Sequence, residues 1–209
     1  MTHREAEDAK AERERDLDRL LTFVDAIVAI AITLLVLPLA ELATHADDYD
    51  TVGSLLREHS EELWSFVLSF YVIARLWMSQ HHAVSPLLVG NTRIVGLLIA
   101  WTFTIVVVPF PTSLVAVSGH DAVTKVLYVG TMATSIGIIG LLRVEIGRHP
   151  ELTDGTPYAG PVGGLVTAGL MLLALMLMLT VPSTSYFPML LLVLDGPLLR
   201  LVDRNRSAA

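Results

Sequence analysis

Long stretches without a charged residue are the feature that most constrains how this chain can fold. Residues 94–119 carry no charge, and neither do residues 158–194. The second stretch is much longer than the about 20 residues that one helix needs to cross a bilayer. The whole chain has a mean hydropathy of +0.61 and 17% charged residues, whereas soluble domains carry roughly 25%. These properties predict a polytopic membrane protein.

Charge and composition exclude several other classes. The net charge of −7 disfavours a protein that binds nucleic acid. The absence of cysteine excludes disulfides, thiolate zinc sites and thiol redox chemistry. The sequence also has no nucleophile elbow, zinc-protease motif or phosphate-binding loop. We therefore expect neither an enzyme nor a bound cofactor.

The apolar segments predict an all-α protein with six transmembrane helices. The run Pro182-Ser-Thr-Ser185 divides the last long stretch into two spans, and Asp195, which has no expected role, interrupts the second of them. The expected spans are Leu20–Ala40, Leu63–Gln80, Ile94–Gly119, Val126–Leu142, Ala159–Val181 and Tyr186–Leu201. The chain then consists of a charged segment (residues 1–18), a membrane domain (19–203) and a short tail (204–209).

The basic residues indicate how these spans are oriented. Six spans place both termini on one side, and the segments on that side hold eleven Lys and Arg residues. The segments on the other side hold only Arg57 and Lys125. Because basic residues are retained in the cytoplasm, both termini are predicted to be cytoplasmic in a multi-pass protein of the cell membrane. The acidic loop after the first span is either a solvated loop or a surface that concentrates cations.

The first span has the most unusual sequence pattern, and it contains an ionisable residue. Asp25 lies within it, and an ionisable residue inside a span is a candidate functional group. Alternatively, Arg19 and Asp25 only anchor the helix, since an anion is favourable near a helix N-terminus. Farther along, Pro38 is predicted to bend or end this helix.

An apolar stripe follows on the same span. Ile30, Leu34 and Leu37 stand at i, i+4 and i+7, which places them on one face of an α-helix, with Thr33 beside them. In a membrane helix such a set usually serves packing or lipid contact. From the residues alone, the Thr33 hydroxyl is expected to bond back to the carbonyl of Ala29.

The motif that contains these residues resembles a known family. It reads Arg-x-x-x-Phe-x-Asp from Arg19 to Asp25 and continues as Ala-Ile-x-Ala-Ile-Ala-Ile-Thr-Leu-Leu-Val-Leu to Leu37. This is similar to the first helix of the transmembrane protein 175 family of potassium channels, in the bacterial form with six spans per subunit. Three further features agree with the resemblance: Trp77-x-x-x-His81-His82, Asn91-x-Arg93 and Pro109-Phe-Pro-Thr112. The sequence departs from the family at Val24, where the family usually has serine.

The resemblance implies a homotetramer in the lipid bilayer, with the first helix of each subunit lining a central pore for potassium ions. By position, the resemblance places Ile30, Leu34 and Leu37 at the pore constriction and gives Thr33 a role in selectivity. Rings of large apolar side chains can close a pore by dewetting, so this constriction would act as a hydrophobic gate.

The resemblance also implies a polar network at the cytoplasmic end of the first two spans. Its members are Arg19, Phe23, Asp25, Trp77, His81 and His82. The histidine pair is a poor chelate for one metal ion, because adjacent helical residues point about 100° apart, so no metal is expected. The alternative for the two histidines is simple hydration at the membrane interface.

Two other functions remain open from the sequence. One is a proton-coupled secondary transporter that uses Asp25 and His81. Transporters usually place charged sites near the bilayer midplane on broken helices, whereas these residues lie at one edge of the membrane. The other is a membrane scaffold that transports nothing.

Overall fold

We analysed a computed structural model of the chain, which describes residues 3–44, 46–118 and 121–155. The fifth and sixth expected spans, Asp195 and the C-terminal tail lie outside these residues. Within the described ranges the chain forms α-helices and two short 3₁₀ turns. They are α1 (His3–Leu34), α2 (Leu37–Ala43), η1 (Ala46–Asp48), α3 (Val52–Glu58), α4 (Ser60–Val84), α5 (Thr92–Val107), α6 (Pro109–Ser118), α7 (Ala122–Arg148) and η2 (Pro150–Leu152).

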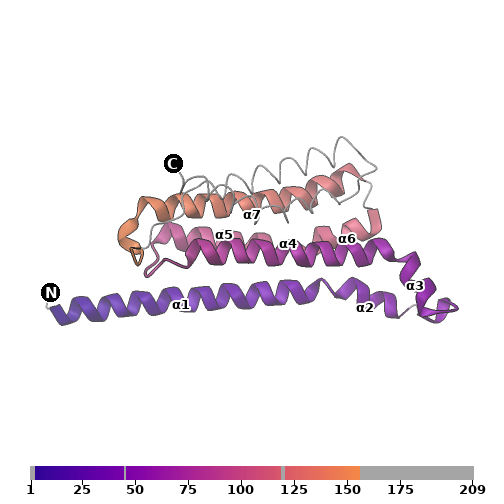
Figure 1. Cartoon of the computed structure of the whole chain (residues 1–209), viewed down its shortest axis with the longest axis horizontal. Coiled ribbons are helices and arrows are strands. Elements are labelled where there is room, and N and C mark those ends of the chain that lie inside the picture. The colour runs from indigo at the N-terminus through magenta and orange to yellow at the C-terminus, as the bar shows by residue number, and fades with distance from the viewer. Residues whose placement is uncertain (1–2, 45, 119–120, 156–209) are drawn as a thin grey trace, which may run out of the picture.

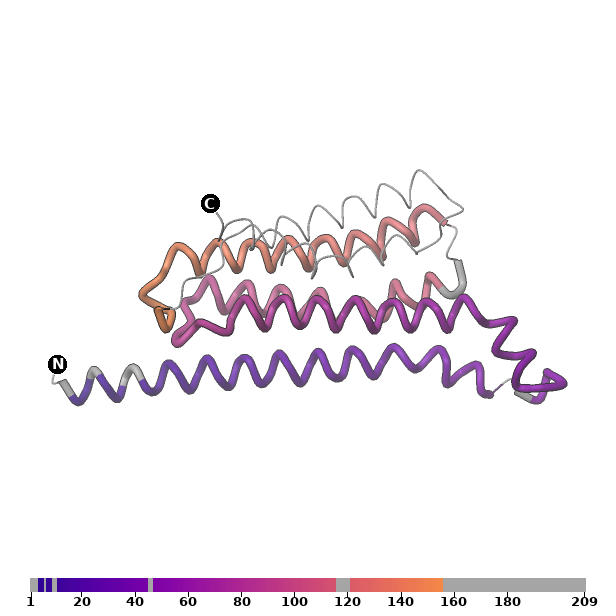
Figure 2. The backbone as a smooth tube through the Cα atoms, in the orientation of Figure 1, coloured from indigo at the N-terminus to yellow at the C-terminus, as the bar shows by residue number. Residues whose placement is uncertain are grey.

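The four long helices lie side by side with similar axis directions (Figure 1). α1 forms one edge of the bundle, α4 and α5 lie next to it, and α7 lies beyond them. The first turns of α1 extend past the other helices (Figure 2). The charged N-terminal segment and the first apolar segment therefore form one continuous helix.

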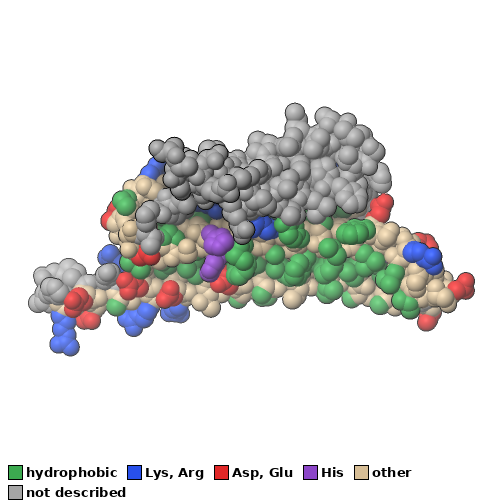
Figure 3. Space-filling view, viewed as in Figure 1, with side chains coloured by type: hydrophobic (Ala, Val, Ile, Leu, Met, Phe, Trp, Pro, Cys, Tyr) green, Lys and Arg blue, Asp and Glu red, His purple; other side chains and the backbone are tan. Residues whose placement is uncertain are grey.

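Three of the described helical segments are long and apolar enough to cross a membrane. They are Ala11–Ala43, Thr92–Val115 and Ala122–Arg148, which cover the first, third and fourth expected spans. α4 contains the second expected span, Leu63–Gln80, but is not one of these three segments. Hydrophobic side chains nevertheless form a band across the visible face of the molecule between its charged ends (Figure 3).

One face of α1 packs into the protein and the opposite face does not. The buried positions recur at helical spacing, so they form a single stripe. They are Leu17, Val24, Val28, Ala31 and Leu35. This stripe joins the hydrophobic core formed by α4, α5 and α7, where Leu98, Trp101 and Met132 are fully buried. The core thus determines which side of α1 remains exposed.

Pro38 interrupts the first span earlier than the sequence predicted. We expected an unbroken helix as far as Pro38, but α1 ends at Leu34 and α2 begins at Leu37. Proline has no N–H to donate to the carbonyl four residues back, and its ring clashes with that carbonyl. The backbone therefore tightens, and Val36 N–H donates to the Thr33 carbonyl at 3.2 Å. Leu37 consequently lies beyond the break and not on the same helix as Ile30 and Leu34.

A similar break divides the third expected span. The sequence predicted one span from Ile94 to Gly119, with a kink at its prolines, and the structure has two helices that meet at Val108. Pro109 is the first residue of α6, a position where the missing N–H costs no helical hydrogen bond. The Thr112 hydroxyl donates to the Val108 carbonyl at 2.9 Å. The same carbonyl also accepts from the Thr112 N–H at 3.1 Å, so Thr112 reinforces the backbone beside the kink.

The packing of α5 leads to a stability prediction. Leu98 is fully buried and its neighbour Ile99 is 45% exposed. We expect Leu98→Ala to lower the free energy of unfolding by about 2–5 kcal/mol, because it leaves a cavity in the core. The matched change Ile99→Ala should cost about 0.5 kcal/mol or less. Thermal unfolding of the purified protein in detergent measures both, and equal losses would contradict this assignment of the core.

Candidate functional site

The apolar stripe predicted for the first span is exposed in the structure. The side chains of Ile30, Leu34 and Leu37 are 57%, 43% and 54% exposed. They lie on the side of α1 and α2 that does not pack against the core. An exposed apolar face of this kind is available to lipid or to another copy of the chain.

Thr33 is exposed beside this stripe. Its hydroxyl donates to the Ile30 carbonyl at 2.7 Å, and not to the Ala29 carbonyl that the sequence suggested. The hydroxyl proton is therefore used in a hydrogen bond to the backbone of the same helix. The oxygen keeps its acceptor capacity and points its lone pairs away from that bond. A hydroxyl held in this way can still coordinate a cation.

The structure brings together part of the predicted polar network. Trp77 Nε1 donates to Asp25 Oδ1 at 2.8 Å and so links α4 to α1. The ring centroids of Trp77 and His81 lie 5.6 Å apart, and those of His81 and His82 lie 6.3 Å apart. These four residues therefore form one continuous set of contacts between the two helices.

The other two predicted members of the network, Phe23 and Arg19, are exposed. Phe23 is 53% exposed, and Arg19 is exposed and makes no hydrogen bond or ion pair with residues in the described ranges. Val24, which stands where the family usually has serine, is fully buried in the core. This position faces apolar neighbours, so valine fits without leaving a polar group unsatisfied.

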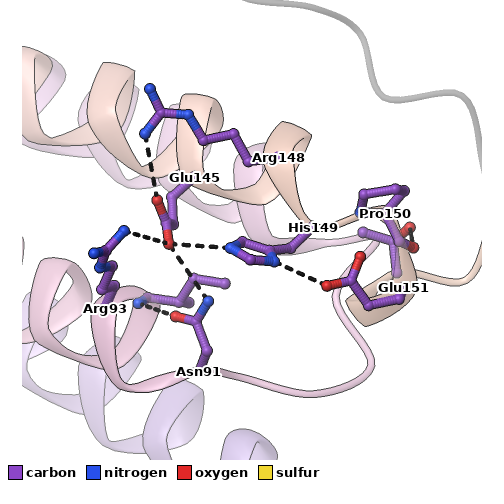
Figure 4. Close-up of polar contacts among 9 residues, drawn as sticks. Asn91, Arg93, Glu145, Arg148, His149, Pro150 and Glu151 are labelled. Atoms are coloured by element: carbon purple, nitrogen blue, oxygen red, sulfur yellow. Dashed lines mark hydrogen bonds and ion pairs between the residues drawn. The ribbon is translucent and has the colours of Figure 1, made fainter.

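A second polar cluster lies where the start of α5 meets the end of α7 (Figure 4). Its centre is Glu145, whose side chain is only 7% exposed. Arg93, Arg148 and His149 approach its oxygens at 3.9, 3.8 and 3.5 Å. Asn91 Nδ2 lies 3.5 Å from the same carboxylate. A buried carboxylate is thus balanced by partners from both helices.

Asn91 also explains where α5 begins. Its side-chain oxygen accepts a hydrogen bond from the Ile94 N–H at 2.8 Å, as an N-cap residue does. An asparagine directly before an apolar helix is a recognisable start signal in sequence. The sequence could therefore have indicated the capping role of Asn91, in addition to its place in the motif Asn91-x-Arg93.

Sequence reasoning missed a contact between α7 and α4. Arg143 Nη2 donates to the Ser79 hydroxyl at 3.1 Å and to the Ser79 carbonyl at 3.3 Å. Both partners are ordinary residues in sequence, and 64 positions separate them. No local pattern marks such a pair.

The acidic loop after the first span is held by its own contacts. The Tyr49 hydroxyl lies 3.1 Å from His59 Nε2, and His59 Nδ1 lies 3.1 Å from Glu62. Thr51 and Ser54 form a capping box at the start of α3. These contacts join the loop to the start of α4.

Comparison with known proteins gives a consistent result. Residues 19–109 match the family described as endosomal/lysosomal potassium channel TMEM175. The fold is similar to a crystal structure of a lysosomal potassium-selective channel TMEM175 homolog from Chamaesiphon minutus, with a TM-score of 0.57 and 22% sequence identity. The similarity covers 87% of this chain and 98% of that chain. None of the curated proteins compared matches the sequence.

Fold and apolar helices together define a multi-pass helical protein of the membrane. Within that class, residues 19–109 match the model of the TMEM175 family, in agreement with the resemblance noted in the sequence.

The end of α7 leads to a pH prediction. The hydrogen bond from His149 Nδ1 to Glu151, at 2.8 Å, holds the pKa of Glu151 below its ordinary value of 4.5. The folded state therefore favours the charged carboxylate. This stabilisation is complete above the ordinary pKa and is lost as the pH falls through the lower folded-state pKa.

We expect Glu151→Gln to remove this part of the acid dependence. The apparent melting temperature of wild type and variant should differ above pH 5 and converge at lower pH. The same change at the exposed Glu12 serves as the control and should leave the pH profile as in wild type. A constant difference from pH 7 to pH 3 would contradict the assignment.

Proposed function

We propose that this chain is a potassium-selective cation channel in which α1 and α2 of four subunits surround a central pore. The observation that carries the proposal is the division of the first span into a buried stripe and an exposed apolar stripe. Ile30, Leu34 and Leu37 expose large apolar side chains, and the span belongs to the part of the chain that matches a channel family.

In this proposal the exposed stripe forms the constriction. Four copies around an axis would stack the side chains of Ile30, Leu34 and Leu37 as apolar rings. Water leaves a narrow apolar passage, and an ion there loses hydration without a replacement ligand. The dry passage is then the closed state, and conduction requires the rings to move apart.

Thr33 supplies the polar layer between these rings. Its hydroxyl proton is donated to the Ile30 carbonyl, which leaves the lone pairs of the exposed oxygen able to accept. A ring of such oxygens can partly replace the hydration shell of a cation, which is how polar ligands select among ions in other pores. We assign Thr33 the selectivity role on this basis.

The network of Asp25, Trp77, His81 and His82 sets the position of the pore helix in this proposal, with Arg19 and Phe23 at its edge. The hydrogen bond between Trp77 and Asp25 joins α1 to α4. The charge bias of the loops places this end of the bundle, and both termini, in the cytoplasm.

The deciding experiment is ion flux in liposomes that contain the purified full-length chain. With potassium as the only gradient, a channel passes potassium passively and brings the membrane to the potassium equilibrium potential. A proton-coupled transporter that uses Asp25 and His81 needs a proton gradient for flux. Absence of passive potassium flux would overturn the proposed function.

The constriction leads to a prediction about polar substitution. We expect Ile30→Asn and Leu34→Asn each to raise potassium flux several-fold, because a polar ring favours water in the narrow passage. The matched control is Phe103→Asn on α5, where the native side chain is 67% exposed outside the stripe. Unchanged flux in both stripe variants, or an equal rise in the control, would contradict this constriction.

The selectivity role leads to a separate prediction. Thr33→Ala removes the hydroxyl but keeps a small side chain in the helix. We expect a several-fold drop in the potassium-to-sodium permeability ratio while potassium flux persists. Thr33→Ser, which keeps the hydroxyl, should retain the ratio. The reversal potential under mixed potassium and sodium gradients measures it, and a loss in both variants would point to packing instead.

A further inference from the structure

The contact between Arg143 and Ser79 has no place in the function proposed so far. Arg143 is part-buried on α7, and one of its guanidinium nitrogens reaches two oxygens of a single residue on α4. A guanidinium within a membrane helix is costly unless it finds polar partners. Ser79 is two residues from Trp77, which donates to Asp25, and this closeness in α4 suggests a role for the Arg143 contact.

Trp77 and Ser79 lie on opposite sides of the same helix. Residues two apart on an α-helix are rotated by about 200°. Trp77 uses its side of α4 to donate to Asp25 on α1, and Ser79 uses the other side to accept from Arg143 on α7. Figure 1 shows α4 between α1 and α7. The part of α4 around Trp77 and Ser79 is therefore hydrogen-bonded to α1 on one side and to α7 on the other.

Electrostatics reinforces this arrangement. Ser79 lies within the last two turns of α4, which ends at Val84. Helix C-termini carry a partial negative charge that attracts cations. Ser79 lies one turn before that last turn, where the effect is weaker, and Arg143 bonds directly to its carbonyl. Sliding or rotation of α4 would break both bonds of Arg143 at once.

We propose that Arg143 is a positioning residue for the pore helix: it fixes the rotation of α4 at Ser79, and thereby holds Trp77 in place to bind Asp25 on α1. The connection runs from α7 through α4 to α1. Its consequence for ion conduction rests on the proposed channel function, whereas its consequence for the environment of Trp77 does not.

The chain offers a matched control on the same two helices. Ser69 Oγ and the Tyr128 hydroxyl lie 3.0 Å apart and form a buried hydrogen bond between α4 and α7. Ser69 is two helical turns from Trp77 and has no part in positioning it in this proposal. Tyr128→Phe therefore removes a hydrogen bond between α4 and α7 that lies two helical turns away from Trp77.

The first test uses fluorine NMR of the full-length protein labelled with 5-fluorotryptophan. The chain has three tryptophans, so the resonance of Trp77 is identified by its loss in Trp77→Phe. We expect Arg143→Gln to shift the Trp77 resonance and leave that of Trp64 in place, and Tyr128→Phe to leave the Trp77 resonance unchanged. An unmoved Trp77 resonance in Arg143→Gln, or an equal shift in Tyr128→Phe, would overturn the proposal.

A milder variant covers the case in which Arg143→Gln does not fold. Ser79→Ala removes the hydroxyl acceptor and keeps the backbone acceptor. It should shift the Trp77 resonance in the same direction by a smaller amount. No shift in a folded Ser79→Ala protein would count against the proposal in that case.

The second test is a double-mutant cycle on the potassium-to-sodium permeability ratio in liposomes. Arg143→Gln and Trp77→Phe should each lower the ratio several-fold, and the double variant should be no worse than the single ones, because both act through the same bond to Asp25. The effects of Tyr128→Phe and Trp77→Phe should multiply instead. Multiplying effects for Arg143 would overturn the proposal, whereas lack of potassium flux in wild type would overturn only the channel function.

Discussion

The packing of one face of α1 against the core is the constraint on which the rest of the site depends. Val24, Val28 and Leu35 bury their side chains, and this fixes the rotation of the helix about its axis. The opposite face is thereby left with the exposed side chains of Ile30, Thr33 and Leu34. In a membrane helix, interior packing is the main force that sets rotation, because lipid tails are as apolar as the side chains themselves. The exposed stripe is therefore a consequence of the buried one.

Polar contacts then fix the helices along their length. Trp77 links α4 to α1, Arg143 links α7 to α4, and Glu145 links the end of α7 to the start of α5. These contacts occur toward the end of the bundle that we propose to be cytoplasmic. The hydroxyls of Ser69, Thr112 and Tyr128 are bonded to one another nearer the other end. Each long helix of the described part thus has at least one polar link to a neighbour.

Much of this arrangement could be predicted from the sequence. Uncharged length predicted spans at Ile94–Gly119 and Val126–Leu142, where the structure has α5 with α6 and α7. The motif around Asp25 indicated both the resemblance and a contact with Trp77. Those signals are local, since a run of apolar residues or a short motif carries them within a few turns. The proline rule is also local, but it does not mark the exact residue at which a helix ends. Pro38 ended α1 at Leu34 because of a clash four residues back, which moved Leu37 onto a separate helix.

Contacts between distant side chains could not be predicted from the sequence. Arg143 and Ser79 are both common residues without a motif, and only the packing of α4 against α7 brings them together. The acceptor of the Thr33 hydroxyl also differed, because the Ile30 and Ala29 carbonyls are equally available in sequence and the tightening of the last turn favours the nearer one. Single sequences therefore reveal the elements and the family more readily than the polar contacts between helices.

The break after α1 has a consequence for the backbone itself. In an uninterrupted helix the carbonyl of Leu34 would accept from the N–H of residue 38, and proline has none to give. The Leu34 residue is partly exposed, and its carbonyl lacks the helical donor that residue 38 would ordinarily supply. Because a carbonyl without that donor favours contact with water over contact with apolar groups, the break adds a polar point at the end of the exposed stripe.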